Sequence, residues 1–186
     1  MKEHENRRIT QTKRYIQESL ILLMESKSIY KISIKELCDR AGINRSTFYN
    51  HYKSQIEVFD ELEKDYLDSI NELYRSEKLG LNPGEAIVEL LKYMEKNLAV
   101  SRLLLGNKVD PEFFSKLKKI TKCQDAIEAM RRFVPAEEFD ETANFCLAGC
   151  YAILREWINK KENRKSPEEI ARLISTLSRN LCNYGK

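Results

Sequence analysis

The residues best suited to chemistry lie in one stretch, positions 34–53, which reads I-K-E-L-C-D-R-A-G-I-N-R-S-T-F-Y-N-H-Y-K. Asn50 carries a donor and an acceptor together, as the edge of an adenine requires, and the long side chain of Arg45 suits a guanine. Other side chains suit phosphate oxygens, which fix position without reading sequence. These are Thr47, Tyr49, His51 and Lys53. The stretch therefore predicts a surface that binds duplex DNA.

These side chains face the right way only if they lie on a helix. At 100° per residue, Phe48 and Tyr52 then point into the protein, whereas Ser46 and Asn50 lie about 160° from Phe48 and point outward. Base edges are expected to meet this outward side, and the phosphate backbones its two flanks. The flanking positions are Thr47 and Tyr49.

Two short helices joined by a turn must position this surface. Ser33-x-x-Glu36 is a capping box that opens the first helix, and Gly42 permits the turn that ends it. Asn44 can cap the second helix, which is expected to end near Tyr52. The apolar residues spaced to lock the pair together are Leu37, Ala41, Ile43, Phe48 and Tyr52. Residues 33–52 therefore predict a helix-turn-helix, whose second helix enters the major groove.

Plainer interpretations of the same residues stay open. Asn44, Ser46 and Asn50 also suit a solvated helix surface, and His51 suits a half-buried position bonded to a backbone carbonyl. The basic residues of a first helix, expected over roughly residues 6–25, could form a solvated face. They include Arg7, Arg8, Lys13 and Arg14. A phosphate contact is therefore expected of this group more than of any one member.

Charge is unevenly distributed along the 186 residues, whose formal net charge is +3. Residues 1–55 contain eleven Lys and Arg against six Asp and Glu, whereas residues 56–186 contain twenty-one against twenty-three. The N-terminal third is thus the part that a polyanion would attract. No apolar run approaches the roughly 20 residues of a membrane span, and the first 15 residues lack a signal-peptide pattern, so we expect a cytoplasmic protein without membrane contact.

Strand signals are scarce, and the expected fold class is all-α. The chain has six Gly and four Pro and no Asn-Gly or Asp-Gly turn. Ser54-x-x-Glu57 is a capping box that opens a long helix, and further long helices are expected to start near Asn82, Asp110, Pro135 and Ser166. Apolar spacing carries the helix from Asn82 through Leu98 and the helix from Asp110 through Ile120 to Ile127. The N-terminal three-helix bundle is therefore expected to precede a larger helical bundle.

The helix expected from about Pro135 to Asn159 argues for a second copy of the chain. Residues 145–154 contain no charge, and their apolar side chains point in every direction round the helix, which is typical of burial on all sides. A wholly internal core helix is the alternative. The residues expected at a homodimer interface are Phe145, Gly149, Ala152, Ile153, Trp157, Leu173, Leu177 and Leu181.

The sequence resembles the TetR/AcrR family of bacterial transcriptional regulators. The resemblance spans residues 9–70 and rests on the family pattern A-G-V-[ST]-x-[GS]-[TA]-[LIF]-Y-x-[HY]-[FY]-x-[SN]-K-x-x-L. Ile43 replaces the usual Val, Asn44 the usual Ser or Thr, and Gln55 the usual Lys. The Asn44 replacement keeps the capping ability, and the Gln55 replacement removes one phosphate contact. The C-terminal half is weakly similar to Gram-positive regulators of the dihydroxyacetone-kinase-activator type.

The resemblance implies a regulator that binds a palindromic operator as a homodimer and is released by a small-molecule effector. It assigns residues 1–53 to a DNA-binding domain and residues 54–186 to a ligand-binding and dimerisation domain, with the long helix from Ser54 shared by both. The tetR-type region then covers about 10–70. A repressor is expected, and an activator is the alternative. The residues expected to contact DNA are Ser33, Asn44, Arg45, Ser46, Thr47, Tyr49, Asn50, His51 and Lys53.

Two other classes of protein compete with this interpretation. An enzyme would need a nucleophile with a base, paired carboxylates or metal ligands, and the two histidines and five cysteines form no such cluster in the sequence. Cys146 and Cys150 are expected to be poor thiolates, since no positive residue follows until Arg155. We therefore expect no catalysis, cofactor or metal. A helical adaptor without DNA is the second rival, and the basic N-terminal part argues against it.

Overall fold

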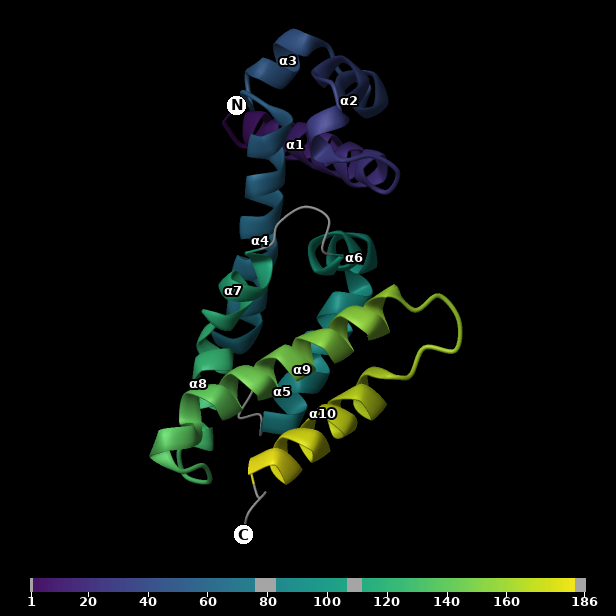
Figure 1. Cartoon of the computed structure of the whole chain (residues 1–186). Helices are drawn as coiled ribbons and strands as arrows, with labels where there is room; N and C mark the ends of the chain where they lie inside the picture. The colour runs from purple at the N-terminus through teal and green to yellow at the C-terminus, as the bar shows by residue number, and fades with distance from the viewer. Residues whose placement is uncertain (1, 76–82, 107–111, 183–186) are drawn as a thin grey trace. The chain divides into compact units, whose positions relative to one another are not determined.

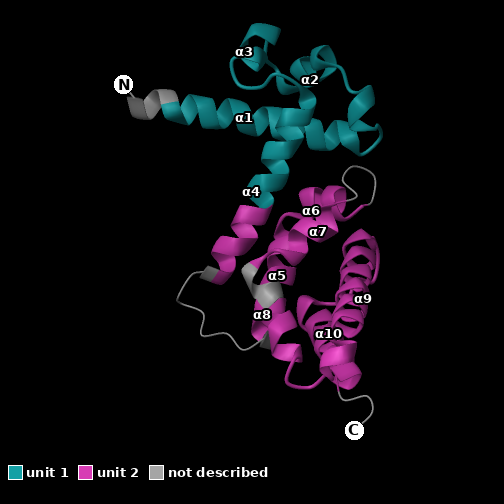
Figure 2. Cartoon of the chain, turned by 60° about the vertical axis from the view of Figure 1, so that its left-hand side comes forward, with its two compact units in different colours: residues 1–66 teal, residues 67–186 magenta. Residues whose placement is uncertain are grey.

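The computed structural model describes residues 2–75, 83–106 and 112–182, and every regular element in these ranges is a helix (Figure 1). The all-α expectation is therefore confirmed. The chain forms two compact units, residues 1–66 and 67–186 (Figure 2). The division falls inside one long helix, α4 (Gln55–Arg75), and C-terminal to the boundary after Lys53 that the sequence suggested.

Unit 1 is built on a small helical core. Its elements are α1 (Lys2–Met24), the single 3-10 turn η1 (Ile29–Lys31), α2 (Ile34–Ala41), α3 (Arg45–Tyr49) and the first half of α4. Helix α1 packs on α2, and α2 on α3. The fully buried side chains of this core include Ile16, Leu20, Leu37, Phe48 and Val58. The start of α4 thus belongs to unit 1 because its apolar face is part of that core.

The turn between α2 and α3 is defined by its end residues. Ser33 Oγ accepts the backbone N–H of Glu36 at 3.1 Å and caps α2. Gly42 ends α2 with φ 68° and ψ 31°, a left-handed conformation that other residues adopt at a cost. Asn44 Oδ1 accepts the backbone N–H of Thr47 at 2.7 Å and starts α3. The predicted caps are therefore confirmed.

Unit 2 contains the second half of α4 and the remaining helices. They are α5 (Pro83–Lys96), α6 (Leu98–Leu105), α7 (Phe113–Lys118), α8 (Thr121–Met130), the 3-10 turn η2 (Ala136–Glu138), α9 (Phe139–Asn159) and α10 (Pro167–Cys182). Helices α9 and α10 run side by side, and α10 also packs on α5 (Figures 1 and 2). Two helix starts expected from the sequence, at Asn82 and Asp110, lie outside the described residues.

Unit 2 has more breaks than the apolar periodicity predicted. The helix expected from Pro83 through Leu98 ends at Lys96, because Asn97 leaves the helical conformation and its side chain donates to the carbonyl of Tyr93 at 2.9 Å. Beyond residue 112, one expected helix is two, α7 and α8. They are separated by an extended Ile120, whose side chain is buried.

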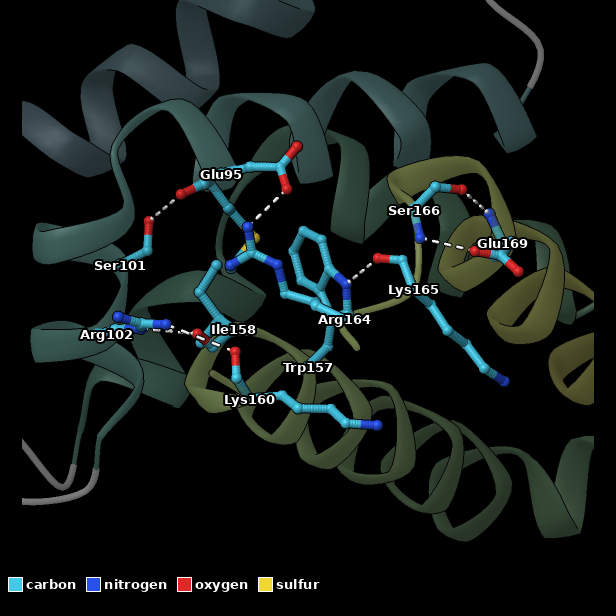
Figure 3. A network of polar contacts seen from close by, with 11 residues as sticks. Glu95, Ser101, Arg102, Trp157, Ile158, Lys160, Arg164, Lys165, Ser166 and Glu169 are labelled. Atoms are coloured by element: carbon cyan, nitrogen blue, oxygen red, sulfur yellow. Dashed lines mark hydrogen bonds and ion pairs between the residues drawn. The ribbon is translucent and has the colours of Figure 1, made fainter. Parts of the chain in front are cut away.

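A polar network fixes the loop between α9 and α10 (Figure 3). Arg102 on α6 donates to the carbonyl of Ile158 at 2.9 Å, which satisfies an acceptor at the C-terminus of α9. Arg164 lies over the ring of Trp157, 5.2 Å from its centroid, and forms an ion pair with Glu95 at 2.6 Å. This network holds the ends of α9 and α10 against α5 and α6.

Candidate nucleic-acid interface

The outer side of α3 is polar and the inner side is apolar. Phe48 and Tyr52 are 0% and 3% exposed. The helical hydrogen bonding continues beyond α3, since the N–H of Tyr52 donates to the carbonyl of Phe48 at 2.9 Å. Ser46 and Asn50 are exposed on the opposite side. The orientation therefore agrees with the helical phase, and the contacts of these side chains with DNA stay a prediction.

The residues expected to contact DNA gather around α3, with one at the start of α2. Those with exposed side chains are Ser33, Asn44, Arg45, Ser46, Tyr49, Asn50 and Lys53. Those with half-buried side chains are Thr47 and His51. The hydroxyl of Ser46 donates to Asn44 Oδ1 at 2.7 Å, the same oxygen that caps the helix. Asn44 and Ser33 therefore have a structural role in starting helices, whatever they contact on DNA.

Arg45 and Tyr49 are paired, which the sequence analysis did not foresee. They lie one turn apart, and the hydrogen bond between their side chains raises the pKa of the Arg45 guanidinium above its usual value. Tyr49 is half exposed. The pair thus presents a cation and a hydroxyl along α3, from its first residue to its last, where a guanine edge and a phosphate are both suitable partners.

A partly buried polar cluster lies on the inner side of the segment that follows α3. Lys13 on α1 lies 2.6 Å from the carboxylate of Glu61 on α4, and the hydroxyl of Tyr52 donates to the same carboxylate. Burial would raise the pKa of Glu61, but hydrogen bonds from Lys13 and Tyr52 lower it below its usual value. Burial, followed by the bond to Glu61, raises the pKa of Tyr52. This cluster joins α1, the residues after α3, and α4.

The same cluster changes the assignment of the basic residues on α1. Lys13 is held by Glu61, and Arg14 forms an ion pair with Glu18 at 2.7 Å. Both cations are therefore partly neutralised within the chain. The sequence could not reveal the Lys13 pair, because its partner is 48 positions away.

An exposed apolar face runs along α9 and α10 in unit 2. Phe145 is 70% exposed and Leu177 is 49% exposed. Of the other residues expected at a dimer interface, Gly149 and Ala152 are exposed, and Ile153, Leu173 and Leu181 are half-buried. Trp157 is the exception: it is 3% exposed and donates its indole N–H to the carbonyl of Lys165 at 2.7 Å, so it faces the interior of unit 2.

Gly149 leaves open space at the centre of this face. A Cβ atom built there would meet nothing within 4 Å. Glycine is unfavourable inside a helix by about 1 kcal/mol relative to alanine, so an exposed helical glycine is unexplained by the chain's own packing. A close approach by another helix would explain it.

An apolar cavity of about 70 Å³ lies inside unit 2. Residues from four helices line it, among them Ile70 and Tyr74 of α4, Leu90 of α5, Phe114 of α7, and Cys150 and Tyr151 of α9. The rings of Phe114 and Tyr151 are 4.6 Å apart. The sequence did not indicate this cavity, because apolar residues are spread evenly over the long helices and their convergence depends on tertiary packing.

Metal sites and membrane spans are both absent from the described ranges. No group of three or more His, Cys, Asp or Glu residues there is placed to hold a metal ion. None of the helices there has the length and apolar character that crossing a bilayer requires.

Comparisons with known proteins point in one direction. A TetR family model described as "Transcriptional regulator C-terminal region" matches residues 82–180. The nucleoid occlusion factor SlmA of Alteromonas mediterranea is 25% identical over 133 residues, which are 69% of this chain and 68% of that protein. The HTH-type dhaKLM operon transcriptional activator DhaS of Lactococcus lactis is 30% identical over 87 residues, 46% of this chain and 44% of that protein.

Solved structures share the fold. A TetR transcriptional regulator from Streptococcus agalactiae superposes with a TM-score of 0.69 at 24% identity, over 96% of this chain and 99% of that one. The dihydroxyacetone kinase operon activator DhaS gives a TM-score of 0.55 at 22% identity, over 91% of this chain and 94% of that one. At these identities the likeness establishes the fold alone.

Proposed function

The chain belongs to the TetR/AcrR family of transcriptional regulators, and from this premise we propose that it is a homodimeric repressor that binds a palindromic operator and is released by a small apolar effector. The observation that carries the proposal is the polar, exposed side of α3 on a buried apolar support. Polar side chains held on a rigid helix suit base-edge recognition in the major groove.

The homodimer is supported by the exposed face of α9 and α10. Large apolar side chains such as Phe145 and Leu177 lie there beside Gly149, which leaves room for a partner helix. The same face on two copies would form a four-helix arrangement about a two-fold axis. Two copies related in this way would present two α3 helices to a site with the same symmetry.

An effector is supported by the cavity in unit 2. At about 70 Å³ it is smaller than a cavity of about 150 Å³ that accepts benzene. A ligand must therefore enlarge it, and ligands that favour one packing shift the population toward that packing. Because Ile70 and Tyr74 of α4 line the cavity, and α4 begins in unit 1, such a shift would act on the helix shared by both units.

Selection of bound sequences from a random duplex pool with the full chain tests the operator. The expected result is a near-palindrome with half-site centres roughly 34–36 Å apart or a multiple of that spacing. Enrichment of an asymmetric site, or no enrichment, would contradict the proposal. Transcription in vitro from a template carrying the selected site then separates the roles, because a repressor lowers the yield.

A second role, activation, is favoured by the likeness to DhaS of Lactococcus lactis, the dhaKLM operon transcriptional activator. An activator would raise the yield of the same transcription reaction. The distinction depends on where the selected site lies relative to a promoter, so templates with the site on the promoter and upstream of it are both required.

Calorimetric titration of a candidate apolar ligand tests the effector. If the ligand releases DNA, saturating operator must weaken ligand binding by the same factor, typically about 5- to 150-fold. Equal ligand affinity with and without operator would show that the ligand does not regulate DNA binding.

A further inference from the structure

Two thiols of α9 and one hydroxyl of α10 converge in the seam between these helices. Cys146 Sγ lies 3.3 Å from Ser178 Oγ, and Cys150 Sγ lies 3.9 Å from the same oxygen. Cys182 is one turn beyond Ser178 on α10. All three cysteines are half-buried thiols. The seam therefore holds a cluster of nucleophilic side chains, one of which, Cys150, also lines the cavity of unit 2.

Hydrogen bonds favour the thiolate form of one member of the cluster. A hydrogen bond from the Cys150 thiol is the main cause that lowers the pKa of Cys146, to about 6. A hydrogen bond from Ser178 lowers this pKa further, whereas burial of the thiol raises it. In the thiol form Cys146 donates to the Ser178 hydroxyl, and in the thiolate form that hydroxyl can rotate to donate instead. For Cys146 the expectation of a poor thiolate is corrected, because it considered only charges near in sequence and not these hydrogen bonds.

Two other thiols have pKa values above the usual range. Burial raises the pKa of Cys182, and the charge on Cys146 raises it further. Burial also raises the pKa of Cys38 in unit 1. Cys146, whose ionisation is favoured, thus lies beside Cys150 at a shared hydroxyl, which is the arrangement of a cysteine that is oxidised and then resolved.

We propose that Cys146 and Cys150 form a peroxide-reactive dithiol site, with Cys146 as the nucleophile and Cys150 as the resolving thiol. The Cys146 thiolate attacks one oxygen of hydrogen peroxide, the O–O bond breaks, and sulfenic acid and hydroxide form. The Cys150 sulfur then displaces the sulfenic hydroxyl, a disulfide forms, and its thiol proton leaves with that hydroxyl as water. Two cysteines are oxidised and one peroxide is reduced.

The disulfide would distort α9 at the face proposed for dimerisation, and this consequence rests on the proposed function. Residues four apart on a helix have Cβ atoms about 5–6 Å apart, whereas a disulfide requires about 3.5–4.5 Å. The turn between Cys146 and Cys150 must therefore tighten or unwind, and Gly149 lies in that turn. Oxidation is expected to weaken dimerisation and operator binding together.

Alkylation of the reduced full chain with monobromobimane, followed by peptide mass mapping, tests the nucleophile. The rate at Cys146 should rise with a midpoint near pH 6, whereas Cys182 and Cys38 stay slow until above pH 9. At pH 6 the expected advantage of Cys146 is about 25-fold, because its greater thiolate fraction outweighs its lower intrinsic nucleophilicity. Equal rates at Cys146 and Cys182 would overturn the assignment.

Oxidation with hydrogen peroxide tests the resolving thiol. Trypsin leaves Cys146 and Cys150 in one peptide, residues 133–155, and Cys182 in another. The first peptide should lose two hydrogens and regain them with dithiothreitol. Cys150→Ser should stop at sulfenic acid, which dimedone labels, whereas Cys182→Ser should behave as the parent. A link to Cys182, a link between chains, or oxidation that spares Cys146 would overturn the proposal.

Operator binding of the oxidised chain tests the consequence separately. Affinity should fall about tenfold or more on oxidation and recover on reduction, and Cys146→Ser should abolish the response to peroxide. A disulfide that forms with unchanged operator affinity would overturn the link to DNA binding. Failure of the reduced chain to bind any DNA would contradict the proposed function, while the mass data would still decide on the dithiol site.

Discussion

Single residues of α3 divide between those that suit base edges and those that suit phosphates. Arg45→Ala and Asn50→Ala should each relax the choice of one base pair, because each removes a side chain matched to a base edge, at about 1–3 kcal/mol of discrimination. Binding constants on operators with single base changes measure the effect. Lys53→Ala is the matched control: it should weaken cognate and random duplexes alike and reduce the salt slope by about 0.9.

If all three variants lose the same affinity on cognate and random DNA, the assignment of Arg45 and Asn50 to base edges is refuted. Local sequence signals sufficed to orient this helix, since the Asn44 cap and the burial of Phe48 follow from spacing alone. The Arg45–Tyr49 pair was missed because the sequence analysis treated the two as separate contacts.

At the scale of helices, the carboxylate of Glu61 ties α4 to α1 and to the residues after α3. Glu61→Gln should lower the free energy of unfolding by about 1 kcal/mol at pH 7. The value is modest because the site is about a third exposed and solvent screens the charge. Urea unfolding measures it, with Asp60→Asn, a change at an exposed position one residue away, as the control.

The effect of Glu61→Gln depends on pH in a defined direction. The pKa of Glu61 is lower in the folded chain than its ordinary value of 4.5, so the unfolded chain takes up the proton first as pH falls. The carboxylate's contribution is complete above pH 4.5 and is lost as pH falls through the lower, folded pKa. A difference between parent and variant that grows on acidification would contradict this role.

The breaks between helices and the ion pairs between distant positions could not be predicted from the sequence. Apolar periodicity continued through Asn97 and Ile120, so it predicted unbroken helices there. Tertiary packing determines both breaks. At Asn97 a side chain competes for a backbone carbonyl, and at Ile120 an extended residue places its side chain in the core. The Lys13–Glu61 pair joins distant positions and has the same origin.

For the molecule as a whole, the exposed face of α9 and α10 is expected to determine whether the chain is a monomer or a homodimer. Gly149→Leu should weaken the proposed homodimer about tenfold or more, because overpacking a close helix contact costs about 1–3 kcal/mol. The monomer should fold at least as well, since open space surrounds Gly149 and leucine favours helix. Sedimentation at micromolar concentration measures both states.

Ala99→Leu, at an exposed position of α6, is the control and should leave the dimer intact. A parent chain that sediments as a monomer at micromolar concentration would contradict the dimer. The sequence identified an apolar helix here and left open a wholly internal one. The 70% exposure of Phe145 within a single chain favours the partner.

The network around Trp157 also makes the fluorescence of this residue an intrinsic probe of unfolding. Trp157 is the sole tryptophan, and its buried ring, its bond to Lys165 and the guanidinium of Arg164 all belong to unit 2. Indole emission should therefore shift to longer wavelength when unit 2 unfolds and should not respond when unit 1 unfolds. Far-ultraviolet circular dichroism reports the loss of helix in both units. Denaturation curves that coincide for the two signals mean one cooperative transition, and curves that separate give each unit its own midpoint without any added label.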